Sequence, residues 1–171
     1  AFLPVPPSKG VAIEAAWFSL GREFARIGHE VNHVSCIAKG LPNVESREGV
    51  RYIRVQGATS VTNPYLLKVL ELPYVLRARK VMTRADILVT HAFWAPILFP
   101  KSKFGKIYVH VGRLPKGQLK LYKKAHRLQV PSISIKEVSE KQIPNEAFKI
   151  KTLPYPLTWH PSENIDFKKK E

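Results

Sequence analysis

The chain has 171 residues, 44% of them hydrophobic and 24% charged, which is the balance of a folded globular protein and excludes a disordered or fibrous one. Lysine and arginine number 28 against 13 acidic residues, and the resulting net charge of +15 favours an anionic partner or a surface kept basic for solubility. The sequence has one cysteine, Cys36, and no apolar run of about 20 residues, so it predicts neither an internal disulfide nor a membrane-spanning helix.

The first third of the chain predicts strands around one helix. "FLPV" at 2–5 is a short apolar run stopped by two prolines, as at the end of a strand. From Ala12 apolar residues recur at spacings of three and four, which predicts an amphipathic helix ended by Gly28. Alternating residues then predict strands over 30–37 and 49–57. Strand, helix and strand in this order form a crossover between parallel strands.

The rest of the chain continues the alternation. Residues 64–84 are helical in composition, and Pro73 predicts a kink or two short helices because proline lacks an amide and clashes with the preceding turn. The apolar runs "ADILVTH" and "KIYVH" predict buried parallel strands that end at His91 and His110. Later residues predict a short basic helix (115–126), a strand (126–132), a helix opened by Ser132 or Ser134, and a last strand (148–156).

Such alternation predicts an α/β fold, namely a Rossmann-like, doubly wound parallel sheet with helices on both faces. At this length one domain is expected, over 1–157, with 158–171 as a linker or tail. Ligands bind sheets of this kind beyond the carboxyl ends of the strands. Three segments are expected there: the loop 5–12, the region of His91 and the loop 110–117.

Three motifs in this order carry a resemblance to a known family. They are "PPSKG" followed by Glu14 and "GHEV", then "ADILVTH", then "KIYVH". Together they resemble the N-terminal domain of the group-one, retaining glycosyltransferases, over nearly the whole chain. The resemblance implies one half of a GT-B fold, in which two Rossmann-like domains face a cleft. Residues 158–171 would then lead towards a C-terminal donor domain absent from this sequence, without which the chain would be inactive.

The resemblance also implies a site. His110 is expected to be the catalytic residue, which orients the acceptor and the transferred sugar or passes a proton. The expected substrate-binding residues are Lys9, Gly10, Glu14, His91 and Arg113. From the residues alone, the loop is either an anion-binding turn or a plain turn, and a histidine at a strand end is either functional or a satisfied structural group.

This sequence departs from the family pattern in three places. Val11 and Ala12 occupy the paired-glycine positions of the loop, which changes how closely its backbone can approach a phosphate. Phe93 stands where the family has a second histidine, and with Trp94 it forms either an apolar wall for an acceptor or a core pair. After the last strand "LPYP" places Tyr155 and Pro156 where the family has Asn-Gly, so the turn must differ.

The expected partners are a nucleotide-sugar donor, a saccharide or lipid-linked acceptor, and an anionic membrane surface. Basic stretches at 77–84, 101–106 and 113–124 interleave with apolar residues, which suits lipid headgroups or a solvated helix face. No nucleic-acid motif stands out, so no nucleic acid is expected. Neither a metal nor a cofactor is expected, because the histidines lack partners at ligand spacing and the sequence has no cysteine pair.

The sequence therefore predicts a glycosyltransferase domain that moves a sugar from a nucleotide-sugar to a saccharide or lipid-linked acceptor. The alternative is a non-catalytic Rossmann-like domain that binds an anionic ligand or a protein partner. Cys36 has apolar neighbours and is expected to be buried and reduced, which suits a cytoplasmic protein, free or peripheral at the inner face of the membrane.

Overall fold

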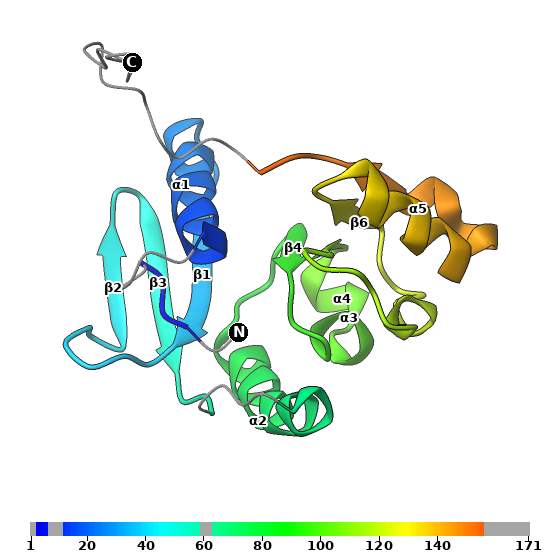
Figure 1. The fold of residues 1–171 in the computed structure, drawn as a ribbon. Coiled ribbons are helices and arrows are strands. Elements are labelled where there is room, and N and C mark those ends of the chain that lie inside the picture. Colours follow the sequence, from blue (N-terminus) through cyan, green and yellow to red (C-terminus); the bar gives the residue numbers. More distant parts are fainter. Residues whose placement is uncertain (1–2, 7–11, 59–62, 156–171) are drawn as a thin grey trace, which may run out of the picture.

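The strands are arranged in two sheets (Figure 1). The computed structural model describes residues 3–6, 12–58 and 63–155, and both sheets lie in this part of the chain. In the first sheet, β1 (Val31–Cys36) pairs in parallel with β3 (Val50–Val55), and β2 (Val44–Arg47) pairs antiparallel with β3. The second sheet is entirely parallel and contains, in spatial order, β4 (Ile87–Thr90), β5 (Lys106–His110), β6 (Arg127–Val130) and β7 (Ile150–Thr152).

Helices connect these strands and lie against both sheets. Helix α1 (Ala12–Arg26) packs on β1 and β3, α2 (Pro64–Val81) packs on the same sheet, and α5 (Ile133–Gln142) packs on β6 and β7. Ser132 Oγ accepts a hydrogen bond from the amide of Ile135, so this serine begins α5. The arrangement is an α/β fold with a parallel sheet flanked by helices, the Rossmann-like class that the sequence predicts.

The first predicted strand is not formed, because residues 3–6 are not in a strand. Pro4 and Pro6 lack the amides that a strand ladder needs. The amide of Val5 donates to Ser35 Oγ at 3.2 Å, and its carbonyl accepts from Arg54, so the polar backbone groups of Val5 bind side chains instead of a neighbouring strand. The described strands accordingly form two sheets where the sequence predicts one.

Several other elements differ from the prediction. The hairpin of β2 and β3 turns at Glu48 and Gly49, whose φ values of 53° and 77° fit a type I′ turn, and β2 was not predicted. Helix α2 continues through Pro73 as one helix of 18 residues, and this proline is exposed. The short elements are α3 (Ala95–Leu98), α4 (Lys101–Phe104), the 3-10 turns η1 (Gln118–Leu121) and η2 (Pro144–Lys149), of which η1 replaces the predicted basic helix.

The main core joins the two sheets. It contains side chains from β1, β3, α2, α4 and the strands of the second sheet, among them the fully buried Phe104, Ile107 and Leu128. Cys36 belongs to it, and burial raises the pKa of its thiol to about 11, so the buried cysteine predicted from the sequence is protonated at neutral pH. No helix of the described residues has the length and apolarity needed to cross a membrane.

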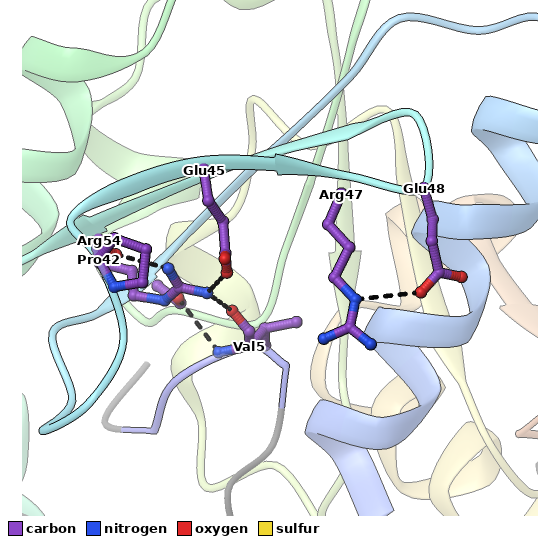
Figure 2. A network of polar contacts seen from close by, with 7 residues as sticks. Val5, Pro42, Glu45, Arg47, Glu48 and Arg54 are labelled. Atoms are coloured by element: carbon purple, nitrogen blue, oxygen red, sulfur yellow. Dashed lines mark hydrogen bonds and ion pairs between the residues drawn. The ribbon is translucent and has the colours of Figure 1, made fainter.

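The buried Arg54 side chain ties the N-terminal segment to the first sheet (Figure 2). Its Nη1 donates to the carbonyl of Pro42 at 2.6 Å, and its Nη2 donates to the carbonyl of Val5 at 2.9 Å and to the Glu45 carboxylate. One guanidinium thus serves two backbone carbonyls and one carboxylate from three chain segments. The guanidinium and Val5 are buried, so the Val5 carbonyl would lose its donor out of water, whereas Pro42 and Glu45 are accessible to solvent.

Arg54→Leu is expected to lower the free energy of unfolding by about 3 kcal/mol, since it leaves the Glu45 carboxylate and two carbonyls without their donor. Urea unfolding followed by circular dichroism measures this value. Arg51 is exposed on the same strand, so Arg51→Leu is the matched control and should change stability by less than about 0.5 kcal/mol. Equal losses in the two variants would show that the Arg54 contacts contribute nothing specific.

Candidate functional site

Two of the predicted site residues meet at the carboxyl edge of the second sheet. His91 follows β4 directly, and His110 is the last residue of the neighbouring parallel strand β5. Trp17 of α1 contacts both: its ring lies parallel to the His91 ring, with centroids 6.1 Å apart, and edge-on to the His110 ring at 5.6 Å. Helix α1 therefore reaches from the first sheet to the carboxyl edge of the second.

Glu14 lies one turn before Trp17 and belongs to the same crevice. Its side chain is buried, with the residue 7% exposed, and its Oε2 has no hydrogen-bond partner among the described residues. Glu14 and Trp17 line a small cavity of about 20 Å³ together with His33 and His91. The indole Nε1 of Trp17 is likewise without a partner among the described residues, so one acceptor and one donor of this crevice are unused.

His110 is held by hydrogen bonds on both ring nitrogens. Its Nδ1 lies 3.2 Å from Oε1 of Gln129, and its Nε2 lies 2.7 Å from the hydroxyl of Tyr155. Because Gln129 Nε2 donates to the carbonyl of Leu153 at 2.9 Å, the amide oxygen must be the atom that faces the imidazole. Nδ1 therefore donates to Gln129, and in the neutral ring Nε2 accepts from Tyr155.

The environment keeps His110 neutral. Burial lowers the pKa of its imidazole, and the hydrogen bond to Gln129 opposes that change only in part. Burial raises the pKa of the Tyr155 hydroxyl, which the positive charge of Arg113 opposes. A protonated phenol therefore donates to an imidazole whose Nε2 carries a lone pair, the arrangement in which a histidine can take up a proton.

The remaining predicted residues are placed as follows. Arg113 is exposed three residues beyond β5, and its effect on Tyr155 places it on the same edge. Lys9 and Gly10 lie outside the described residues, as does Val11. The structure thus brings Glu14, His91 and His110 around Trp17, with Arg113 beside Tyr155.

Sequence reasoning missed Gln129 and Tyr155 as site residues. Gln129 is the register partner of His110 on β6, and Tyr155 comes three residues after β7. Gly112 is the signal that could have pointed to this contact, because a Cβ there would lie 2.8 Å from the Tyr155 hydroxyl oxygen and 3.0 Å from His110 Nε2. A side chain at position 112 would therefore require the Tyr155 hydroxyl or the His110 ring to move.

Phe93 and Trp94 form a core pair and not a wall of the site. Their rings meet edge to face at 5.0 Å, both pack on the main core, and Trp94 Nε1 donates to the carbonyl of Lys68. The amide of Phe93 donates to the buried Glu71 carboxylate at 2.7 Å, which holds the segment after His91 on α2. The sequence left both interpretations open, and the packing supports the core pair.

Neither a protein-family model nor a curated protein matches the chain. Among the described residues, no group of three or more histidine, cysteine, aspartate or glutamate side chains could hold a metal ion. The side chains at and beside the carboxyl edge offer a neutral imidazole, a phenol, a carboxylate oxygen without a partner among the described residues, and an indole N–H likewise without one.

Gln129→Glu is expected to raise the pKa of His110, because a carboxylate beside Nδ1 stabilises the imidazolium. The titration of the His110 ring by NMR measures the change, and the wild-type spectrum should show the proton on Nδ1. Gln56 is exposed away from any histidine contact, so Gln56→Glu is the control and should leave the titration unchanged. A proton on Nε2 in the wild type would contradict the assignment.

The chain is expected to lose stability in acid because of His33, which lines the cavity beside Glu14. Burial and then the Arg54 charge lower the pKa of His33 from 6.5 to about 4. Between these values the unfolded chain binds the extra proton, so the free energy of unfolding falls as the pH decreases from about 6.5 to 4, by on the order of 3 kcal/mol.

Urea unfolding at a series of pH values measures this loss. His33→Gln removes one titrating group and should weaken the dependence on pH, leaving the part that the lowered pKa values of His91 and His110 contribute, whereas His29→Gln, at an exposed position, should preserve it. Equal pH dependence in wild type and His33→Gln would show that another group is responsible.

Proposed function

We propose that this chain is the acceptor-side domain of a glycosyltransferase that transfers a sugar from a nucleotide-sugar to a saccharide or lipid-linked acceptor. The observation that carries the proposal is the pairing of a buried, neutral His110 with the Tyr155 hydroxyl at the carboxyl edge of a parallel sheet. Glu14 also supports it: its buried Oε2 has no partner among the described residues and lines the small cavity beside Trp17 and His91, and buried acceptors of this kind suit sugar hydroxyls.

In the proposed reaction His110 orients the acceptor hydroxyl and takes up its proton at Nε2, directly or through Tyr155. The acceptor oxygen then bonds to the anomeric carbon of the sugar, and the bond from that carbon to the nucleotide diphosphate breaks. Gln129 accepts from Nδ1 throughout, so it holds the ring in the required tautomer and stabilises the imidazolium. Glu14, His91 and Arg113 are the proposed substrate-binding groups, and no cofactor besides the nucleotide-sugar substrate is invoked.

A cytoplasmic location and an alternative function are also proposed. The buried thiol of Cys36 supports a cytoplasmic location, where cysteines stay reduced. The alternative function, a non-catalytic domain that binds an anionic ligand or a protein, is supported by the net charge of +15 and by Val11 and Ala12 at the family's paired-glycine positions. A direct assay of transfer separates the two functions.

The test uses the natural gene product that contains this chain, assayed for sugar transfer from UDP-glucose and GDP-mannose to a panel of saccharides and lipid-linked sugars. His110→Ala should lower kcat by about 100-fold or more, since it removes the group that takes up the proton. His29→Ala, at an exposed turn, is the control and should retain full turnover.

Two outcomes would overturn the proposal. One is turnover that survives His110→Ala unchanged. The other is a gene product without a second Rossmann-like domain after Glu171, because a transferase of this class needs a donor site; the non-catalytic alternative would then stand.

A further inference from the structure

The four strands of the second sheet begin beside basic residues. Lys106 and Arg127 are the first residues of β5 and β6, Lys149 directly precedes β7, and Arg84 lies three residues before β4. Neighbouring strands are about 4.8 Å apart, and parallel strands all start at the same edge of a sheet. The cations therefore gather at the amino edge, at the opposite end of the strands from His110.

Helix α4 adds cations to this edge. Lys101 and Lys103 lie on α4, and together with Arg84 and Lys106 they line an open basin of about 650 Å³. The basic edge consists of six lysine and arginine residues at this end of the sheet: Arg84, Lys101, Lys103, Lys106, Arg127 and Lys149.

The proximity of these cations is evident at His126, which lies among them. Desolvation, followed by repulsion from Lys106, Arg127, Lys101 and Lys149, lowers the pKa of His126. Four members of the basic edge thus act on one imidazole, although they come from α4 and from the starts of three different strands.

Most of these charges have no acidic partner. Within the described residues, Lys149 pairs with Glu146 at 3.0 Å, whereas the other five members of the basic edge form no ion pair with a carboxylate. Asp86 also lines the basin but makes no ion pair there. Unpaired cations gathered in this way create a positive potential that attracts anions.

Exposed apolar side chains accompany the cations. Phe148 is 67% exposed beside Lys149, and Arg127 Nη1 donates to its carbonyl at 3.3 Å. Ile87, the first residue of β4, is 55% exposed. Cations mixed with exposed apolar groups suit a lipid interface, where headgroups bind the charges and the apolar groups leave water.

We propose that the basic edge docks this protein onto an anionic lipid bilayer by binding phosphate-bearing headgroups. This inference stands apart from the transferase proposal, because it uses none of the residues around His110. Lys106 and His110 are at opposite ends of β5, about 13 Å apart at 3.3 Å per residue. A headgroup bound at Lys106 is therefore a docking contact and not the acceptor of a reaction at His110.

The test is flotation of the 171-residue chain with vesicles of phosphatidylcholine mixed with phosphatidylglycerol, at low salt. The double variant Lys101→Gln, Lys106→Gln should lower the partition coefficient about 30-fold, from about fivefold per removed charge. Lys39→Gln, Arg51→Gln removes the same charge from exposed positions of the first half of the chain and should change it less than about twofold. High salt should release the wild type, since it screens the headgroups.

A second pair of variants tests the apolar part and does not depend on charge. Phe148→Ser should weaken binding several-fold, whereas Tyr65→Ser, at an even more exposed aromatic residue on α2, should not. Circular dichroism shows that each variant is folded.

Three results would overturn the proposal. The matched double variant could lose as much binding as Lys101→Gln, Lys106→Gln, which would mean that net charge alone acts. Inorganic phosphate could release the protein at an ionic strength at which chloride does not, which would assign the edge to a soluble phosphate ligand. A single-stranded oligonucleotide could bind the wild type and lose to the same double variant while vesicles do not, which would make the edge a nucleic-acid site. Loss of transfer in His110→Ala is independent of all three.

Discussion

Parallel pairing of β4 to β7 is the constraint from which both functional surfaces of this protein follow. Strands that run in one direction place all their last residues at one edge and all their first residues at the other. His110 and Gln129 are consequently neighbours although 19 residues separate them in the chain. By the same geometry Lys106 and Arg127 lie together at the far edge. An antiparallel pair would have mixed the two sets.

The carboxyl edge is positioned from outside the sheet as well as from within it. Helix α1 packs on the first sheet, and its Trp17 contacts both His91 and His110. The buried Glu71 of α2 accepts a hydrogen bond from the amide of Phe93, two residues after His91. Arg54 secures the segment around Val5 against the first sheet. Three buried contacts from different elements thus position the segments around this edge, and each joins groups that are distant in the chain.

The sequence predicted those features that depend on local pattern. Helix α1, which ends two residues before Gly28, and the strands that lead to His91 and His110 follow from periodicity and apolar runs. The strand predicted at 2–5 failed because its prolines lack amides and Val5 binds side chains instead. Tyr155 was missed because its contact with His110 depends on strand register and on a turn 45 residues away, which no local pattern encodes.

Gly112 shows how a position without a side chain can govern the chemistry beside it. The phenol oxygen lies 2.7 Å from His110 Nε2, and a methyl group at position 112 would crowd both atoms from the side, at 2.8 Å and 3.0 Å. Proton transfer requires heavy atoms about 2.6–3.2 Å apart, so a side chain at position 112 that shifted either ring would lengthen this contact. The distance between the Tyr155 hydroxyl and His110 Nε2 therefore depends on the loop that follows β5, in which Gly112 is the second residue.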